Sequence, residues 1–410
     1  MKLLIKSVAI AAALGAASWA SAQSWPVYGG DTGNQRYSQA SQITPANVNK
    51  LSVKWALQLG TNRSQESTPI LVGDTLYVTS SFGPKNVFAV NAKTGEVRWK
   101  YSPEMPKGVD QYACCDVNSR GVSYNDGKIF FGRLDAQVTA LDAKTGKEIW
   151  TSKVVDYTQG SVITSPPTLV KNMVITGFGG GEYGVRGALV ALDQATGKEI
   201  WRTHTVPVGN EKNADTWKGD SGKTGGGAAW FIGSYDPKLN LIYYGTSNPG
   251  PWSAIVRGND SSDVGKFTNL YTASIVAVDA NTGKLKWYYQ AVPQDIWDLD
   301  AVGGFIMADV QIEGRTRKVI MQAPKSGVFY ILDRTNGQFI SAEPFVQVNW
   351  VTGFDKKNNG KPMINPDAFY DQTKSVLISP GGGGAHNWAA MSYNPNAGLV
   401  YLPYSAGSYT

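Results

Sequence analysis

Short apolar runs and polar turns alternate along the chain, and one such unit recurs. It is clearest at residues 140–150, ALDAKTGKEIW, where an apolar strand ends in Asp-x-x-Thr-Gly and an alternating strand returns to tryptophan. Near-copies occupy 89–99, 191–201 and 277–287, and a decayed copy occupies 331–340. Glycine supplies the positive φ that such a tight turn requires. The pattern therefore predicts repeated strand–turn–strand units.

The spacing of these units indicates how they assemble. Trp99, Trp150 and Trp201 are 51 residues apart, and Trp287 follows after a longer gap. A period near 50 built from strands is typical of a β-propeller, in which the tryptophan can fill the seam against the next blade. Further strand-like runs lie at 68–79, 128–133, 173–176, 241–246, 319–322 and 399–402, and helical periodicity is nearly absent apart from a short capped turn at 45–51.

These runs add up to six or seven blade equivalents, and the sequence stops directly after a strand. A propeller usually closes by pairing its two ends, because an open strand edge invites aggregation. The chain therefore either closes with few blades or is the N-terminal portion of something longer, and we expect the second.

Composition agrees with one large all-β domain, since 46 Gly, 20 Pro, 13 Trp and 20 Tyr suit a chain full of turns. Residues 1–22 carry two lysines, an apolar run and a final Ala-Ser-Ala, which predicts a cleaved secretory signal. The domain would then be 23–410, exported to a bacterial periplasm. Loss of the two lysines lowers the net charge of +6 to +4.

The charges are scattered and form no nucleic-acid footprint. Such a mildly basic surface is either simply soluble or weakly attractive to an acidic electron carrier. No run after the signal approaches transmembrane length, so we expect no stable membrane insertion.

Cys114 and Cys115 are the only two cysteines, and they are adjacent. Cysteines of an exported protein are expected to be oxidised, which predicts a vicinal disulfide; buried thiols or an intermolecular bridge are the alternatives. Trp230 follows the glycines 225–227 and could cover a planar ligand or fill a blade seam.

Four oxygen-bearing side chains stand in the loops between the repeats. Glu182 lies within the glycine-rich segment 177–187, Asn248 follows a strand, and Asp298 and Asp300 alternate. If extended, the two aspartates share a side and repel each other unless a cation lies between them. The set suits a hard ion such as calcium, or comprises four unrelated loop residues.

Other chemistries find no support in the sequence. His204 and His386, the only histidines, form no metal-binding spacing. There is no Ser–His motif, no Walker loop, and no GxGxxG that opens a helix.

Several motifs together resemble one family. The blade repeats, Cys-Cys-Asp-x-x-x-Arg-Gly, Gly-Gly-x-Glu-Tyr-Gly-Val-Arg-Gly, Gly-Gly-Gly-x-x-Trp, Asn-Pro-Gly-Pro-Trp and Trp-Asp-x-Asp are similar to those of the pyrroloquinoline quinone (PQQ) dehydrogenases of the methanol/ethanol type. The resemblance covers essentially all of the mature chain. It implies an eight-bladed propeller whose last blades this chain lacks, and oxidation of primary alcohols to aldehydes by hydride transfer to metal-bound PQQ. A periplasmic cytochrome c would receive the electrons.

The same resemblance implies roles for individual residues. Asp298 would be the catalytic base, and the Cys114–Cys115 disulfide and Trp230 would lie on opposite faces of PQQ. Residues expected to bind its carboxylates and quinone oxygens are Glu66, Arg120, Thr164, Gly180, Gly181, Lys325, Asn387 and Trp388. The metal would be held by Glu182 and Asn248, with the quinone itself supplying donors. Together with the oxygen set described above, the predicted metal ligands are Glu182, Asn248, Asp298 and Asp300.

Two departures from the family pattern qualify this picture. Asp300 stands where calcium-type members usually have a small or hydroxyl residue, and an added carboxylate favours a lanthanide over calcium. Ala228 and Ala229 replace polar residues often found before Trp230.

Two other functions are compatible with a propeller of this kind. The first is a quinohaemoprotein with a fused cytochrome beyond the chain end, although no Cys-x-x-Cys-His occurs here. The second is a non-catalytic propeller scaffold of the outer-membrane lipoprotein kind. Such lipoproteins need a cysteine just after the signal, where this chain has Gln23.

Overall fold

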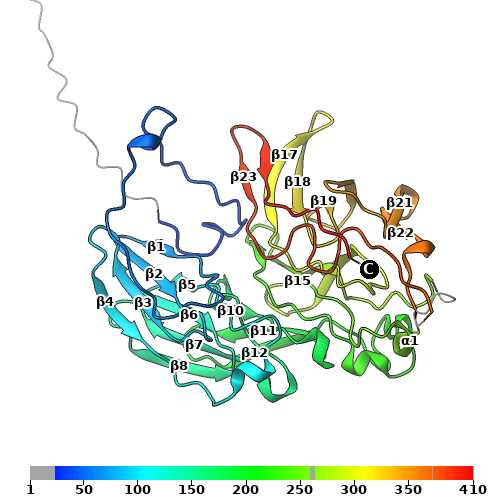
Figure 1. Ribbon diagram of the computed structural model, residues 1–410, viewed down its shortest axis with the longest axis horizontal. Coiled ribbons are helices and arrows are strands. Elements are labelled where there is room, and N and C mark those ends of the chain that lie inside the picture. Colours follow the sequence, from blue (N-terminus) through cyan, green and yellow to red (C-terminus); the bar gives the residue numbers. More distant parts are fainter. Residues whose placement is uncertain (1–23, 259–263, 372, 410) are drawn as a thin grey trace, which may run out of the picture.

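The computed structural model describes residues 24–258, 264–371 and 373–409, so the predicted signal at 1–22 lies outside it. In the described ranges, five sheets have four strands each and two sheets have two. The five larger sheets are antiparallel meanders that follow one another around the molecule in chain order (Figure 1). This confirms the predicted all-β fold with repeated blades, whereas the count of eight blades stays a prediction.

The strands keep the order of the sequence within every sheet. The first sheet contains β1 (Ile70–Val72), β2 (Thr75–Thr79), β3 (Val87–Asn91) and β4 (Val97–Tyr101). The second contains β5 (Ser123–Asn125), β6 (Lys128–Gly132), β7 (Gln137–Asp142) and β8 (Glu148–Lys153). The third contains β9 (Thr168–Val170), β10 (Met173–Thr176), β11 (Ala188–Asp193) and β12 (Glu199–His204).

The remaining sheets follow the same plan. The fourth contains β13 (Ser234–Asp236), β14 (Leu241–Gly245), β15 (Ser274–Asp279) and β16 (Leu285–Gln290). The fifth contains β17 (Ile306–Ile312), β18 (Arg315–Gln322), β19 (Val328–Asp333) and β20 (Phe339–Pro344). The two smaller sheets pair β21 (Val351–Asp355) with β22 (Lys361–Ile364), and β23 (Ser392–Asn394) with β24 (Leu399–Tyr401).

Helices within the described ranges are single turns. They are α1 (Ala254–Arg257) and the 3₁₀ turns η1 (Val48–Lys50), η2 (Val109–Tyr112), η3 (Tyr157–Gln159), η4 (Gly181–Tyr183), η5 (Ala214–Thr216), η6 (Ser221–Thr224), η7 (Lys356–Asn358) and η8 (Pro366–Ala368). The first of them, η1, falls at the predicted capped turn. Over the described part of the chain, no helix is long and apolar enough to cross a bilayer.

The hydrophobic core is divided among the seams between neighbouring sheets. Between the second and third sheets, for example, Phe130, Val138, Trp150, Val174 and Val190 form one buried cluster. Similar clusters join the first sheet to the second, the third to the fourth and the fourth to the fifth. Burial of apolar surface in these seams therefore holds successive blades together.

The tryptophan that ends each repeat fills these seams, as predicted. Trp150 is only 9% exposed, donates from Nε1 to the carbonyl of Gln194 at 3.1 Å, and lies so close to Gly197 that a Cβ there would come within 2.7 Å of its ring. Trp99 and Trp201 make both contacts with the turns that follow them. The glycine of Asp-x-x-Thr-Gly is thus required by the neighbouring indole as well as by its own positive φ.

The decayed repeat keeps only part of this arrangement. Trp287 still packs beneath Gly337. The carbonyl of Arg334, however, accepts the hydroxyl of Tyr243 at 2.8 Å, and Trp287 Nε1 has no hydrogen-bond partner among the described residues. Loss of the repeat pattern in the sequence therefore coincides with loss of one docking contact.

The meander topology separates two sets of connections. Because adjacent strands run in opposite directions, the turns after the first and third strands of a sheet emerge at one end, and the connections after the second and fourth emerge at the other. The Asp-x-x-Thr-Gly turns follow third strands, whereas the long glycine-rich and aspartate-rich loops follow second and fourth strands. The loops that carry the candidate site therefore gather at one end of the blades.

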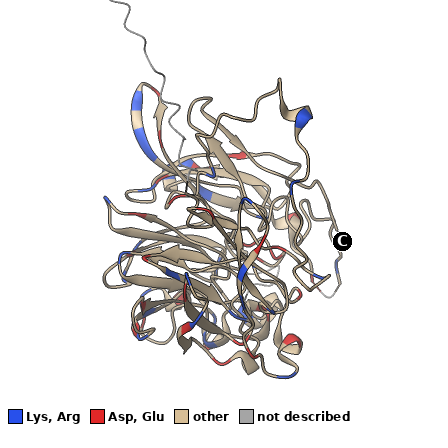
Figure 2. Ribbon diagram, turned by 90° about the vertical axis from the view of Figure 1, so that its left-hand side faces the viewer, with Lys and Arg blue, Asp and Glu red and all other residues tan. Residues whose placement is uncertain are grey.

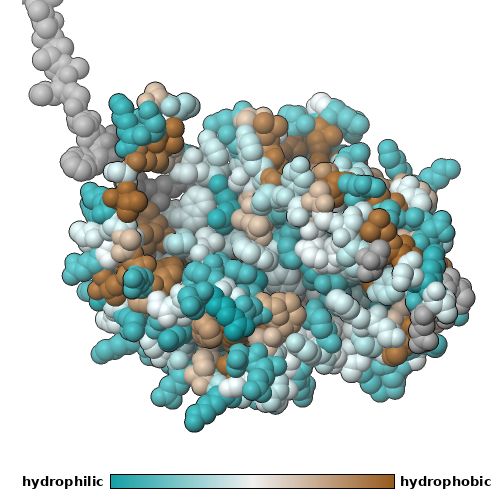
Figure 3. Space-filling view, in the orientation of Figure 1, coloured by the Kyte–Doolittle hydropathy of each residue, from teal (hydrophilic) through white to brown (hydrophobic). Residues whose placement is uncertain are grey.

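Basic and acidic residues are scattered along the described part of the chain, in agreement with the sequence (Figure 2). Exposed apolar side chains gather on the segment before β1, at Ile43, Val48, Leu51 and Val53 (Figure 3). This segment contributes no strand to the five larger sheets.

Candidate active site

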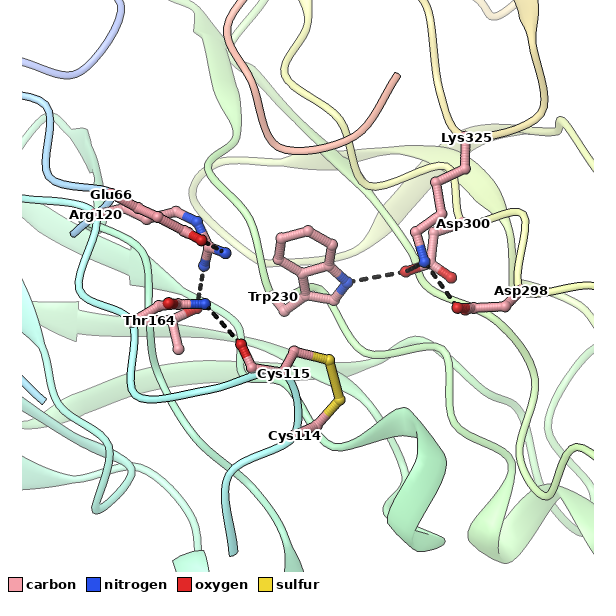
Figure 4. Close-up of a disulfide and its surroundings, with 10 residues drawn as sticks. Glu66, Cys114, Cys115, Arg120, Thr164, Trp230, Asp298, Asp300 and Lys325 are labelled. Atoms are coloured by element: carbon pink, nitrogen blue, oxygen red, sulfur yellow. Dashed lines mark hydrogen bonds and ion pairs between the residues drawn. A yellow bond between two sulfur atoms is a disulfide. The ribbon is translucent and has the colours of Figure 1, made fainter. Parts of the chain in front are cut away.

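A cavity of about 320 Å³ lies where the loops after second and fourth strands meet. Its walls are formed by Glu66, Cys114, Cys115, Asn118, Arg120, Val162, Thr164, Gly179, Gly180, Glu182, Trp230, Trp252, Asp298, Asp300, Lys325, Asn387 and Trp388. Figure 4 shows its central part, with charged groups on both sides of Trp230 and the disulfide near them. Residues more than 300 positions apart in the sequence thus share one cavity.

Most of the residues singled out from the sequence line this cavity, whereas Gly181 and Asn248 do not. Both are buried beside it, and a Cβ at Gly181 would lie 3.4 Å from Asn248 Oδ1. The structure therefore brings the whole predicted set together, and the roles assigned to its members stay predictions.

Four wall residues were not singled out, namely Asn118, Val162, Gly179 and Trp252. Three of them stand inside motifs that the sequence does display: the Cys-Cys segment, the glycine-rich loop and Asn-Pro-Gly-Pro-Trp. Val162 carries no such signal, because an apolar residue before a strand is ordinary.

The predicted vicinal disulfide between Cys114 and Cys115 is present. It follows η2 and is held by Asn118, whose side-chain amide donates to the carbonyl of Cys115 at 2.9 Å. Cys115 and Asp116 both adopt positive φ, at 65° and 75°, so the backbone turns sharply here. Because of this turn, both cysteines of the disulfide line the cavity and present an apolar surface to it.

A buried cation and its partners form one side of the cavity. Arg120 is 4% exposed; it pairs with Glu66 at 2.8 Å and donates to Thr164 Oγ1 at 2.5 Å. Its guanidinium carbon lies 5.2 Å from the centre of a ring of Trp230. Burial lowers the pKa of Arg120 and raises that of Glu66, and each charge opposes the shift of the other.

One donor of this group remains available. Arg120 Nε is buried and has no hydrogen-bond partner among the described residues. A buried donor without a partner is costly, and an anionic ligand in the cavity would supply the missing acceptor. The carboxylates of PQQ fit this requirement.

Two carboxylates and one ammonium group form the other side. Lys325 Nζ lies 2.9 Å from Asp298 Oδ2 and 3.8 Å from Asp300 Oδ2, so both aspartates face the same cation. The sequence predicted a shared side on the condition that the segment is extended, but Asp298 has a φ of +65° and the segment turns there. The cation that it predicted between the two carboxylates is a metal ion, which stays a prediction. Burial first, then the charge of Asp300, raises the pKa of Asp298 well above its ordinary range, and Lys325 only partly offsets this.

Asp300 also organises its neighbours. Its Oδ1 accepts the backbone N–H of Asn248 at 2.9 Å, and its Oδ2 accepts the indole N–H of Trp230 at 3.0 Å. One carboxylate therefore fixes the orientation of the aromatic wall and the backbone of a predicted metal ligand.

Glu182 is accessible from the cavity, and the protein around it still excludes much of the water. This desolvation, followed by repulsion from Asp300, raises the pKa of Glu182. Removal of the repulsion by a bound cation would favour both carboxylates in their charged form.

The donors present fit a hard cation. Asn248 Oδ1 and Asp298 Oδ1 are buried oxygens with no hydrogen-bond partner in the described part of the chain. That part contains no ready-made group of three or more His, Cys, Asp or Glu side chains that could hold a metal. An ion here would therefore need the Asn248 amide and donors from a bound ligand as well as the carboxylates.

The chain matches a known family model over residues 25–353: the β-propeller domain of glucose, ethanol and alcohol dehydrogenases that use PQQ. A quinohaemoprotein alcohol dehydrogenase of Comamonas testosteroni is 44% identical over 92% of this chain and 54% of its own length. A lanthanide-dependent methanol dehydrogenase of Methylacidiphilum fumariolicum is 38% identical, over 92% of this chain and 64% of its own.

Among solved structures, the quinohaemoprotein alcohol dehydrogenase ADHIIG of Pseudomonas putida HK5 is similar, with a TM-score of 0.89 and 40% identity over 94% of this chain and 57% of that one. The chain thus spans about half the length of the curated relatives it matches.

Proposed function

This chain belongs to the family of PQQ-dependent alcohol dehydrogenases, and on that premise we propose that it oxidises primary alcohols to aldehydes with PQQ and a metal ion bound in the cavity. The observation that carries the proposal is the cavity itself. Three features meet in it. They are the buried Arg120, whose Nε has no hydrogen-bond partner among the described residues; the apolar walls formed by the disulfide and the indole of Trp230; and the Asp298 carboxylate paired with Lys325.

The walls are suited to a flat anionic molecule. Arg120, supported by Glu66 and Thr164, would bind a carboxylate of PQQ through its free Nε. The disulfide and the indole of Trp230 would fix the plane of the ring and exclude water. Bound PQQ supplies a two-electron acceptor, and a cation beside it withdraws electron density from that acceptor.

In this proposal, Asp298 accepts the alcohol proton. Lys325 holds its Oδ2, whereas Oδ1 has no hydrogen-bond partner among the described residues. The proton of the alcohol would move to Oδ1 as the substrate is oxidised. Burial makes this carboxylate a stronger base than an exposed one, because it raises the pKa.

For the metal, we propose a lanthanide in preference to calcium, held by Glu182, Asn248, Asp298 and Asp300. Burial, followed by repulsion from the added carboxylate of Asp300, raises the pKa of Glu182 and of Asp298, and a trivalent ion would offset more of that repulsion than a divalent one. A lanthanide-dependent relative at 38% identity supports this choice.

A periplasmic location and a cytochrome c as electron acceptor complete the proposal. The first rests on the signal-like segment 1–22 and the second on the family. A second form, a quinohaemoprotein, is supported by the relative of that name at 44% identity. Haem absorbance in active protein purified from its natural source would favour that form, and active protein without haem would contradict it.

The test is reconstitution. Purified protein freed of metal is loaded with PQQ and either La³⁺ or Ca²⁺, then assayed on a panel of primary alcohols with an artificial dye as acceptor. Activity that needs both PQQ and metal is expected, with La³⁺ effective at the lower concentration. Protein that binds PQQ and metal but oxidises no alcohol would refute the function, and a preference for Ca²⁺ would refute the lanthanide alone.

A further inference from the structure

One fully buried cation connects two of the loops that form the cavity. Arg257, at the end of α1, is 0% exposed. It donates from Nε to the carbonyl of Pro251 at 2.8 Å, and from Nη2 to the carbonyls of Asp295 at 3.1 Å and Trp252 at 3.4 Å. Its Nη1 donates to Asn269 Oδ1 at 2.7 Å. A single guanidinium therefore joins the segment 248–252 to the segment 295–300.

In the segment 295–300, the side chain of Asp295 bonds to the backbone of the same segment. Asp295 is 1% exposed; its Oδ1 accepts the N–H of Trp297 at 2.9 Å and its Oδ2 accepts the N–H of Leu299 at 2.8 Å. These two residues flank Asp298, whose φ is +65°, a conformation that costs energy for a residue other than glycine. Asp295 thus holds the backbone in the turn that presents Asp298 to the cavity.

Hydroxyl groups hold the next two carbonyls of the same segment. Tyr370 donates to the carbonyl of Ile296, and Tyr409 donates to that of Trp297 at 3.1 Å. The indole of Trp297 donates to the carbonyl of Ala368 at 2.9 Å. These bonds fix the segment to the surrounding protein without reaching the segment that carries Asn248. The two segments also meet directly, where the Asn248 N–H donates to Asp300 Oδ1 at 2.9 Å and the Ala301 N–H donates to the carbonyl of Thr246 at 3.1 Å.

We infer that Arg257 is a positioning residue: together with the bond from the Asn248 N–H to Asp300, its guanidinium sets the separation between the segment of Asn248 and the segment of Asp298. The inference rests on the proposed function, because it assigns Arg257 to the placement of a proposed metal ligand and the proposed base. Lysine cannot replace Arg257, because its side chain ends in a single ammonium group. That group cannot reach the carbonyls of both segments at once, as the planar guanidinium does.

The test compares Arg257→Met and Arg257→Lys with a matched control, Arg334→Met. Arg334 is likewise buried and bonds to backbone and carboxylate, at Ala308 and Asp236, yet it lies between the fourth and fifth sheets and does not line the cavity. All proteins are loaded with PQQ and La³⁺. The measurements are kcat, KM for the alcohol, the dissociation constant of La³⁺ by direct titration, and unfolding in urea.

A displaced catalytic group can cost on the order of 100-fold in rate. We therefore expect Arg257→Met to lower kcat by about 10- to 100-fold and to weaken La³⁺ binding, with a smaller change in KM. Arg257→Lys should recover only part of both. Arg334→Met should lower stability and leave kcat and La³⁺ binding of the folded protein unchanged.

The outcomes separate this inference from the proposed function. Unchanged kcat and La³⁺ affinity in folded Arg257→Met would overturn the inference while alcohol oxidation stands. If Arg257→Met does not fold, Arg257→Lys provides the test. A kcat and a La³⁺ dissociation constant of Arg257→Lys that both lie within twofold of wild type would overturn the inference. If wild type binds PQQ and La³⁺ but oxidises no alcohol, the proposed function fails, and the La³⁺ affinities still decide the role of Arg257.

Discussion

At both ends of the blades an aspartate accepts two backbone N–H groups, but the pKa of the aspartate shifts in opposite directions at the two ends. At the repeat end, Asp142 Oδ1 accepts the N–H groups of Lys144 and Thr145 at 3.1 and 2.7 Å. At the cavity end, Asp295 likewise accepts two backbone N–H groups. The hydroxyl and N–H of Thr145 lower the pKa of the half-buried Asp142, whereas complete burial raises that of Asp295 to about 6. Hydrogen bonds therefore stabilise a charge in water but do not offset complete burial.

This contrast separates stability from function in the fold. The repeat turns are short, exposed and alike, and each receives the tryptophan of the preceding repeat. The cavity loops are long and different from one another, and they bury charges whose partners come from distant parts of the chain. Changes at the first end should act on folding alone, and changes at the second should act on chemistry.

The largest expected effect is at Asp298. Asp298→Asn removes the proposed base, and asparagine tolerates the positive φ of this position. Since general base catalysis contributes on the order of 10²- to 10⁴-fold, kcat of the protein loaded with PQQ and metal should fall by about that factor. The measurement is steady-state oxidation of a primary alcohol. Asp142→Asn, at the repeat end, is the control and should keep its kcat, and a loss below about 10-fold in Asp298→Asn would exclude Asp298 as the base.

The next effect is on stability at the other end. Trp150→Ala empties a seam and removes the bond to Gln194, which should lower the free energy of unfolding by about 3–5 kcal/mol. Trp150→Phe keeps most of the packing and should cost about 1 kcal/mol for the hydrogen bond. Urea denaturation followed by circular dichroism measures both. Equal stability of the alanine and phenylalanine variants would show that the indole does not dock the blades.

A third effect concerns the buried carboxylate. Because the pKa of Asp295 is about 6 in the folded protein, against an ordinary 3.8, the folded state retains a proton that the unfolded chain releases. Stability should then fall as pH rises from about 4 to about 6, by about 3 kcal/mol from this group. Asp295→Asn should remove that decline. The check is the urea midpoint at several pH values, and an unaltered pH slope in the variant would contradict the assignment.

Much of the fold could be predicted from the sequence because its signals are local. Asp-x-x-Thr-Gly specifies a turn within five residues, and the tryptophan four positions after the glycine packs in the next seam at a fixed spacing. The vicinal disulfide likewise needed only the adjacency of Cys114 and Cys115. Each of these outcomes depends on neighbours in the chain or on the period of the repeat.

The geometry of the site could not be predicted in this way. The resemblance of motifs to a family identified the candidate residues, but it did not show which of them bond to each other. The bond from Trp230 to Asp300 joins positions 70 apart, and the pair of Lys325 with Asp298 joins positions 27 apart. Arg257 and Asp295 carried no signal at all, because their partners are mainly backbone groups, which look the same in every sequence. Only the three-dimensional structure shows that these bonds hold the cavity loops.

The smallest effect completes the comparison. Asp142→Ala removes a turn acceptor and should lower stability at pH 7 by about 0.5–1.5 kcal/mol, the usual contribution of a hydrogen bond. Because the pKa of Asp142 is lowered in the folded protein, its contribution exists above the ordinary aspartate pKa and is lost as the pH falls through the lower folded value. The difference between wild type and Asp142→Ala in urea should therefore shrink between pH 7 and pH 3, whereas the decline caused by Asp295 runs in the opposite direction. If the difference stays constant over that range, the charge of Asp142 does not stabilise the turn, and the two ends of the blades do not differ in the way that burial predicts.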